Sequence, residues 1–350
     1  MKKSLIALAA LAATASFAQS SVTIWGVVDA GLQNVKQNGV SKTQLTTSGL
    51  SSSQLGFRGT EDLGGGMSAS FWLEGTLVND TGTPAGLQFG RRSTLDLAGS
   101  FGAIRLGRDY TPTFWNHTVF DPFGTLGSGA GSNITLASFA SNATTAARTS
   151  NGVSYLYNMA ANAGSHGLGS KGVYAQVTHA FGEQLSTAAA QTNQYQGVRV
   201  GYAAGALNVA VATANTVVSA SAKDKHTNIA GSYDLGVAKL MAINSTFTNG
   251  TTNVKYTANQ IGAQIPMGAG YIPVSYAAGK NNADSKQGNQ FAIGYVHNLS
   301  KRTALYGTYS SITNKNGGAY GFNGGNGGFA SGLTATGNGT GLDLGVRHSF

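Results

Sequence analysis

Residues 340–350, the last of the chain, read TGLDLGVRHSF and alternate strictly between two kinds of side chain. In an extended chain, alternate residues share one face, and here that face would carry Leu342, Leu344, Val346, His348 and Phe350. The pattern predicts a strand whose two faces meet different surroundings. A strand at a chain terminus frays unless it is paired. A closed barrel, in which the last strand pairs with the first, supplies that partner and removes the open edge.

The same two-residue rhythm runs through most of the chain. Clear examples are residues 21–29, 53–58, 67–77, 198–203, 207–212, 272–277 and 291–299. Counting segments of about ten residues predicts about sixteen strands, with short turns alternating with longer loops, as in bacterial membrane barrels. We therefore expect an all-β fold, a transmembrane antiparallel β-barrel, without a domain boundary.

Residues 1–18 have the features of a cleaved secretory signal peptide. Lys2 and Lys3 precede a short apolar stretch, and the small residues Ser16 and Ala18 follow in the cleavage-site positions of Ser16-Phe17-Ala18. The apolar stretch is shorter than the roughly 20 residues that a membrane-spanning helix needs. We expect the barrel to occupy residues 19–350.

Composition narrows the classes of function. Charged residues make up 10% of the chain, there are 51 glycines, and cysteine is absent, which excludes disulfides and thiol chemistry. Without Lys2 and Lys3 the formal charge falls from +9 to +7, from 20 basic and 13 acidic residues. This excess is mild and unclustered, so nucleic acid is not an expected partner.

Several motifs resemble one family. GFRGTEDLGGG at 56–66, LGRDYTP at 106–112, LSKRT at 299–303 and GVRHSF at 345–350 resemble the Gram-negative general porins of the betaproteobacterial, anion-selective, trimeric type. The resemblance implies an outer-membrane, water-filled channel for passive diffusion of small hydrophilic solutes and inorganic ions, with modest anion preference. It further implies a homotrimer, contact with outer-membrane lipids and lipopolysaccharide, recognition by the barrel assembly machinery, and no enzymatic activity, cofactor or metal. In the terminal motif, Val346, His348 and Phe350 would form the signature for closure and assembly.

Alternation stops over residues 111–149, which are rich in Gly, Ser, Asn and Ala. A loop this long in a compact fold is usually functional. The resemblance places it as the third loop, which folds into the barrel and narrows it.

Arginines are the most informative charges. Arg58 lies opposite Leu55 and Phe57 and should face the lumen, because a lipid-facing arginine at mid-membrane costs about 2–4 kcal/mol. Arg91 and Arg92 are adjacent, so alternation predicts that one points inward and the other outward or toward a rim. The resemblance favours Arg91 as the inward one, whereas local alternation favours Arg92.

The resemblance also completes a candidate constriction. It adds Arg148 to Arg58 and Arg91 in a basic wall, and it implies an acidic side for which Asp121 and Glu74 are the candidates. Gln54 departs from the family, in which many relatives carry arginine, and this weakens the expected anion selectivity. Arginines that are merely solvated in a wide channel remain the alternative interpretation.

Other functions find less support. GLGSKG at 167–172 matches a dinucleotide-binding spacing, but a strand pattern follows it rather than a helix, so a turn is expected. The six histidines lack metal-ligand spacing, and His179 and His297 fit a polar–aromatic girdle near the lipid interface. A plugged structural or adhesive barrel, or a barrel hydrolase, would be the competing classes.

Overall fold

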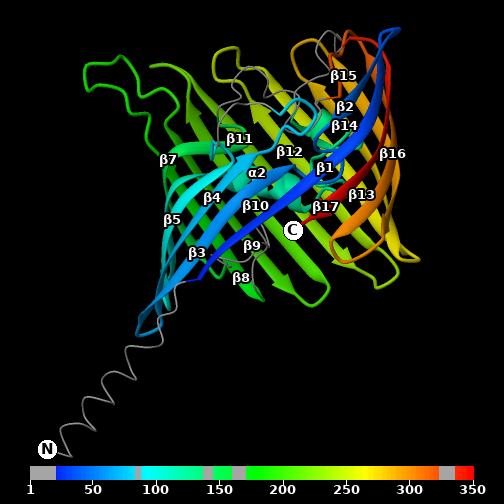
Figure 1. The fold of residues 1–350 in the computed structure, drawn as a ribbon. Coiled ribbons are helices and arrows are strands. Elements are labelled where there is room, and N and C mark those ends of the chain that lie inside the picture. The colour runs from blue at the N-terminus through cyan, green and yellow to red at the C-terminus, as the bar shows by residue number, and fades with distance from the viewer. Residues whose placement is uncertain (1–20, 83–87, 137–144, 160–170, 323–335) are drawn as a thin grey trace, which may run out of the picture.

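The computed structural model describes residues 21–82, 88–136, 145–159, 171–322 and 336–350. These residues form one closed antiparallel sheet that surrounds two short helices (Figure 1). Within these ranges, no helix is both long and apolar enough to cross a membrane. The strands are β1 (Ser21–Gln37), β2 (Val40–Thr46), β3 (Gln54–Gly64), β4 (Met67–Thr76), β5 (Arg92–Gly99), β6 (Gly102–Tyr110), β7 (Arg148–Tyr157), β8 (Gly172–Ala180), β9 (Tyr195–Ala204), β10 (Leu207–Val217), β11 (Lys223–Asp234), β12 (Lys239–Thr248), β13 (Lys255–Met267), β14 (Gly270–Asn281), β15 (Gln287–Asn298), β16 (Thr303–Lys315) and β17 (Gly339–Ser349).

The 17 strands of the described chain make a 16-stranded barrel, because β2 and β3 together occupy one position beside β1. The first part of β1, Ser21–Val27, pairs with β3, and its second part, Gly31–Gln37, pairs with β2. Between β2 and β3 the chain turns inward at residues 47–53. The carboxylate of Asp29 holds this turn by accepting hydrogen bonds from the backbone N–H groups of Gly49, Leu50 and Ser51. The predicted strand number is confirmed.

The first and last strands close the barrel. β1 pairs with β17 from Val27, opposite Ser349, to Gln37, opposite Gly339. Gly26 and Phe350 extend the pairing by exchanging backbone hydrogen bonds of 3.1 and 3.0 Å. The blue and red strands therefore run side by side in Figure 1. The predicted pairing of the two terminal strands is confirmed.

The two faces of the sheet differ in the way that the alternation predicts. Outward side chains are mainly apolar and exposed, as Ile229 (59%) and Leu344 (54%) show. Inward ones on the same strands, such as Asn228 and Asp343, are polar and buried. Apolar residues outside and polar residues inside are the arrangement of a barrel in lipid with a hydrated interior.

The two ends of the barrel carry different connections. One end has mostly tight turns, such as 65–66, 205–206 and 268–269, and is called here the short-turn end. The other end, called the long-loop end, has longer connections, including 111–147, 181–194 and 316–338. Positive backbone φ angles at Gly64, Gly65 and Gly66 show why the first of these turns requires glycine.

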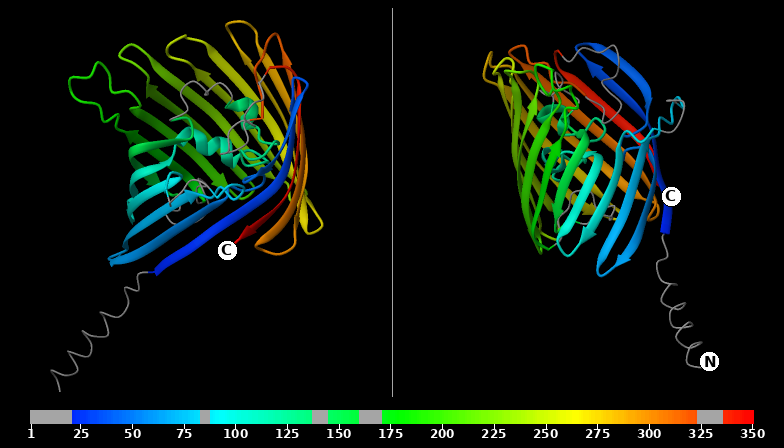
Figure 2. Two further views of the ribbon diagram at one scale, coloured as in Figure 1. Left: turned by 45° about the horizontal axis from the view of Figure 1, so that its top comes forward. Right: turned by 90° about the vertical axis from the view of Figure 1, so that its left-hand side faces the viewer.

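The connection between β6 and β7, residues 111–147, is called the inner loop because its described parts lie inside the barrel (Figure 2). It contains α2 (Pro112–Val119) and α3 (Ser132–Thr135). The hydroxyl of Thr111 caps α2 by accepting a hydrogen bond from the N–H of Phe114, and Pro112 occupies the first turn, where it is tolerated. The predicted interruption of the strands at 111–149 matches these bounds within two residues.

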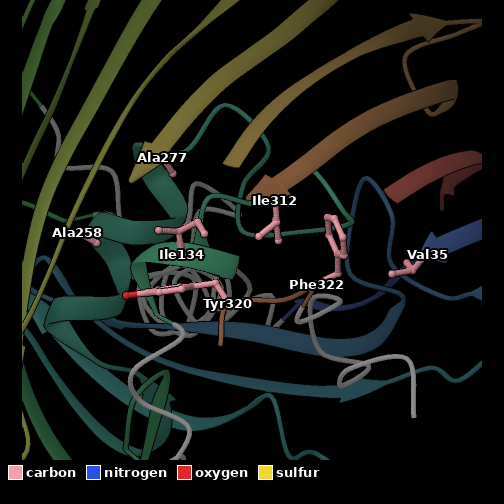
Figure 3. Close-up of a cluster of buried hydrophobic side chains, with 7 residues drawn as sticks. All are labelled: Val35, Ile134, Ala258, Ala277, Ile312, Tyr320 and Phe322. Carbon is pink, nitrogen blue, oxygen red and sulfur yellow. The ribbon is translucent and has the colours of Figure 1, made fainter. Parts of the chain in front are cut away.

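A hydrophobic cluster joins the inner loop to the barrel wall and to another loop. Ile134 of α3 packs with Tyr320 and Phe322, which follow β16 (Figure 3). The wall contributes Val35, Ala258, Ala277 and Ile312. These contacts tie α3 to the side of the barrel that β13–β16 form.

Candidate pore constriction

The inner loop is hydrogen-bonded to the wall formed by β9–β12. Asn116 of α2 donates to the side chain of Asn228 (2.7 Å) and accepts from Arg199 (2.7 Å). His117, the next residue, places its Nε2 3.3 Å from Nε2 of His226, and its Nδ1 lies 3.1 Å from the hydroxyl of Thr135 in α3. These partners belong to two strands and a second helix, so hydrogen bonds in several directions hold α2 in place.

Asp121 shapes the loop between the two helices. Its buried carboxylate accepts hydrogen bonds from the backbone N–H groups of Phe123, Thr125 and Gly131, and from the side-chain amide of Gln260 (2.8 Å). Asp121 is only 3% exposed, and burial raises the pKa of its carboxyl group. The Asp121 carboxylate therefore binds three backbone amides of the inner loop and one side chain of the barrel wall on β13.

The opposite part of the barrel carries a cluster of arginines on β3–β7. Arg91, just before β5, forms a 2.6 Å ion pair with Glu74 of β4. Arg148, at the start of β7, lies 4.2 Å over the ring of Tyr110 and donates to the Tyr110 hydroxyl and to the carbonyl of Arg91. Glu74 is thus on the same side as the arginines, and Arg91 and Arg148 are neighbours.

Arg58 completes the set of predicted basic residues. It pairs across β3 and β4 with Trp72, and its guanidinium lies 5.2 Å from the Trp72 ring centre. Trp72 is 2% exposed and faces inward, so Arg58 does so too. Gln54, the position that departs from the family, is also buried on the inner face of β3.

Both members of the Arg91–Arg92 pair face inward, whereas strict alternation predicted that one would point inward and the other outward or toward a rim. Strand β5 begins at Arg92, so the alternation of faces does not extend back to Arg91. Arg92 lies 4.7 Å over Trp72 and is 3.5 Å from the carboxylate of Asp96. Arg92 faces inward as the first residue of β5, and Arg91 faces inward from the segment that precedes this strand.

Sequence reasoning missed a buried ionic network beside this pair. Arg105 of β6 donates to both oxygens of Asp96 on β5 and to Asp109 four residues further on (2.6 Å). Arg92 and Asp96, and likewise Arg105 and Asp109, have the same parity, so the sequence indicates that each pair shares a face. It does not reveal the register that brings the two strands' charges together.

These residues are called the arginine wall: Arg58, Arg91, Arg92, Arg105 and Arg148, with the carboxylates Glu74, Asp96 and Asp109. Five cations and three anions leave an excess of two positive charges. The inner loop is anchored to β9–β15, on other strands of the closed sheet. The barrel interior is therefore narrowed between a basic wall and a folded loop that packs against the remaining strands.

The residues of the terminal motif lie where the barrel closes. Val346 and His348 on β17 face outward, opposite Ala30 and Val28 of β1, and Phe350 covers Gly26. His348 also lies 2.9 Å from the hydroxyl of Thr303 on β16. Residues 1–18 lie outside the described part of the chain.

Comparison with known proteins agrees with this architecture. A sequence model of the family described as Gram-negative porin matches residues 5–317. Outer membrane porin protein 32 of Delftia acidovorans is 39% identical over 362 residues, which cover 100% of both chains. An outer membrane porin protein of Bordetella pertussis is 27% identical over 370 residues, covering 89% of this chain and 94% of that protein.

Among solved structures, the anion-selective porin from Comamonas acidovorans has the same fold. The TM-score is 0.83 at 35% identity, covering 95% of this chain and 100% of that one. The chain belongs to the Gram-negative porin family. It is an outer-membrane β-barrel that forms a channel, and in such barrels the short turns face the periplasm and the longer loops face the cell exterior.

Proposed function

We propose that the protein is a trimeric general-diffusion channel for small hydrophilic solutes and inorganic ions, with a modest preference for anions. The observation that carries the preference is the uncompensated positive charge of the arginine wall. Charged side chains that line a narrow pore set its ionic selectivity. The similar porin from Comamonas acidovorans is anion-selective, which supports the same direction of preference here. The proposal includes no covalent step.

The predicted residues take different parts in this proposal. Arg58 and Arg148 are partly exposed and are not ion-paired to a carboxylate among the described residues, so they present charge to the lumen. Arg91 supplies charge that Glu74 largely neutralises. On the loop side, Asp121 acts mainly by holding the shape of the inner loop.

The proposed partners follow from the same family. The protein would assemble as a homotrimer through outward apolar side chains, contact outer-membrane lipids and lipopolysaccharide, and be inserted by the barrel assembly machinery. Val346, His348 and Phe350 would supply the terminal signature for that insertion. All three side chains are exposed on the outer face, which supports their being accessible to the assembly machinery from outside the barrel.

The test is the reversal potential of the purified protein in a planar bilayer under a salt gradient. We expect conductance in groups of three and an anionic reversal potential that decreases as salt screens the wall. Arg148→Gln should shift the potential toward zero, because it removes one of the two excess charges. Arg302→Gln, in a short turn at the periplasmic end, is the matched control and should leave the potential unchanged.

The opposite results would be decisive. A cationic potential in the unmodified protein would show that the carboxylates outweigh the arginines. Equal shifts of the reversal potential in Arg148→Gln and Arg302→Gln would show that selectivity depends on the total charge of the protein and not on the position of the arginine in the pore. Absence of conductance would favour the plugged barrel instead.

A further inference from the structure

Two histidines from distant parts of the chain meet where α2 packs against the barrel wall. His117 belongs to α2 and His226 to β11, and their Nε2 atoms are 3.3 Å apart. The hydroxyl oxygen of Ser245 on β12 lies 3.0 Å from Nε2 of His226 and 3.4 Å from Nε2 of His117. All three side chains are buried, and the three residues are called here the histidine site. The histidines are 109 positions apart in the sequence, so no metal-ligand spacing is visible there.

The three polar atoms of the histidine site have the spacing of ligands around a tetrahedral cation. Zn²⁺ binds imidazole nitrogen at about 2.0–2.1 Å, which places two ligands of a tetrahedral site about 3.3 Å from each other. The observed separations of 3.0, 3.3 and 3.4 Å agree with this value. The ring centres of the two histidines are 5.3 Å apart, so the Nε2 atoms are the near ends of the rings. A single cation can therefore contact all three atoms.

A chain of hydrogen bonds shows that Nε2 of His226 carries no proton. Arginine only donates, so the side-chain oxygen of Asn116 faces Arg199, and the Asn116 nitrogen donates to the oxygen of Asn228. The side-chain nitrogen of Asn228 therefore points toward the Thr113 carbonyl and, at 3.3 Å, toward Nε2 of His226. Because an amide nitrogen only donates, Nε2 of His226 is the acceptor. The neutral form of imidazole is the one that binds metals.

The surroundings of His117 suit its Nε2 atom to the same role. Its Nδ1 atom lies 3.1 Å from the hydroxyl of Thr135 in α3, which can accept the ring proton. With that proton on Nδ1, the Nε2 lone pairs of both histidines face the space between the rings. Burial lowers the pKa of His117 to about 3, so its ring is neutral at neutral pH. Histidines that bind metals usually donate their other ring N–H in this way, which fixes the tautomer and the orientation of the ring.

Small cavities adjoin residues of the histidine site. One of about 20 Å³ has His226 and Asp224 in its lining, and one of about 10 Å³ has Ser245 and Thr135. A water molecule needs about 10–15 Å³, so the larger cavity has room for one. Asp224 is buried two residues before His226 on the inward face of β11, where its carboxylate favours a nearby cation. Room for a water molecule and a neighbouring negative charge both suit a partly hydrated cation.

We propose that the histidine site binds one divalent transition-metal ion of the zinc class and that this ion locks the inner loop to the barrel wall. His117 and His226 supply nitrogen ligands, Ser245 supplies an oxygen ligand, and water completes the coordination. The described residues contain no group of three or more His, Cys, Asp or Glu side chains that could hold a metal, so two imidazoles are the strong ligands here. The site is separate from the arginine wall and does not depend on the ionic preference of the pore.

The test measures Zn²⁺ binding to the untagged, full-length purified porin in detergent, after a chelator has removed any bound metal. Equilibrium dialysis against zinc chloride should give one ion per chain. His226→Gln should weaken binding at least about tenfold, because even the loss of a residue that supports a metal ligand costs about 10–100-fold. His297→Gln, on the outer face of β15, is the matched control and should bind like the unmodified protein. Mg²⁺ should not compete, since it prefers oxygen ligands.

Locking of the inner loop is measured by hydrogen exchange of the α2 amides. At a free Zn²⁺ concentration 100 times the Kd, release of the loop should be suppressed about a hundredfold, because the ion binds only the anchored state. The suppression should disappear in His226→Gln and persist in His297→Gln. Exchange that does not respond to Zn²⁺ in the unmodified protein would refute the locking.

The binding site itself would be refuted by equal affinity in His226→Gln and the unmodified protein, or by an equal loss of affinity in His297→Gln. If His226→Gln does not fold, X-ray absorption at the zinc edge of the unmodified, Zn²⁺-loaded protein decides. Two imidazole ligands per ion are expected, and fewer than two would overturn the site.

Discussion

At the residue scale, the arginines of the pore are distinguished by their partners. Arg105 is enclosed by Asp96 and Asp109, whereas Arg148 rests on Tyr110 and a backbone carbonyl. An arginine whose charge is balanced contributes to the framework, because breaking a buried pair leaves a costly unpaired charge. An arginine held by neutral acceptors keeps its charge available to passing ions. The same residue type thus serves two purposes within one cluster.

Gln54 offers a gain-of-charge experiment at this scale. It lies on the inner face of β3, four residues before Arg58, and its side-chain oxygen has no hydrogen-bond partner among the residues that the structure describes. Gln54→Arg should increase the anionic reversal potential, since it raises the excess of the arginine wall from two charges to three. Gln54→Met, which changes no charge, is the control. An unchanged potential in Gln54→Arg would show that this part of the wall does not face the ion path.

At the element scale, α2 is held against the wall by groups that must keep defined protonation states. The Nε2 atoms of His117 and His226 are 3.3 Å apart, so at least one of them must be unprotonated to accept the hydrogen bond. The hydroxyl of Ser245 lies 3.4 Å from Nε2 of His117. Burial lowers the pKa of His117 to about 3 from its ordinary value of 6.5. The anchoring of the inner loop therefore depends on a neutral imidazole.

Acid should weaken this anchoring. Because the pKa of His117 is lower in the anchored loop than in a released one, the released state takes up the proton first. The free energy of release should be constant above about pH 7 and should fall as pH decreases from about 6.5 toward about 3. Hydrogen exchange of the α2 amides, corrected for the intrinsic pH effect, measures it. In His117→Gln, which cannot titrate, the pH dependence should be reduced; an unchanged profile would assign the effect to another group.

At the scale of the whole molecule, stability depends on closing the sheet. The pairing of β1 with β17 joins residues about 300 positions apart, and without it two unpaired edges would face lipid. Phe350 supplies the last pair of hydrogen bonds, and its ring lies over Gly26, where a Cβ atom would overlap it. The final residue is therefore part of the seam between the two terminal strands.

Deleting Phe350 should destabilise the barrel by about 1–3 kcal/mol, from the two lost hydrogen bonds and the unpaired backbone groups that remain. The loss of compact migration in gel electrophoresis after heating should occur at a lower temperature than in the unmodified protein. Leu342→Ala, on the same outward face but within the paired strand, is the control and should have a smaller effect. Equal melting of the deletion variant and the unmodified protein would show that closure is complete without Phe350.

The amino-acid sequence by itself determined the strands, their inward and outward faces, the pairing of the termini and the place of the inner loop. The strands and their faces follow from local alternation, because each strand must present one face to lipid and the other to the interior. The pairing of the termini follows from the need to remove the open edges of the sheet, and the place of the inner loop is what the resemblance to porins implies. The tertiary structure alone decided how the charges meet. Arg91 turns inward outside the strand that begins at Arg92, and Asp96, Arg105 and Asp109 form one network only through the register of β5 and β6. The register between strands and the path of the inner loop depend on contacts between residues that are far apart in the sequence. The alternation of side chains within one strand contains no information about those contacts.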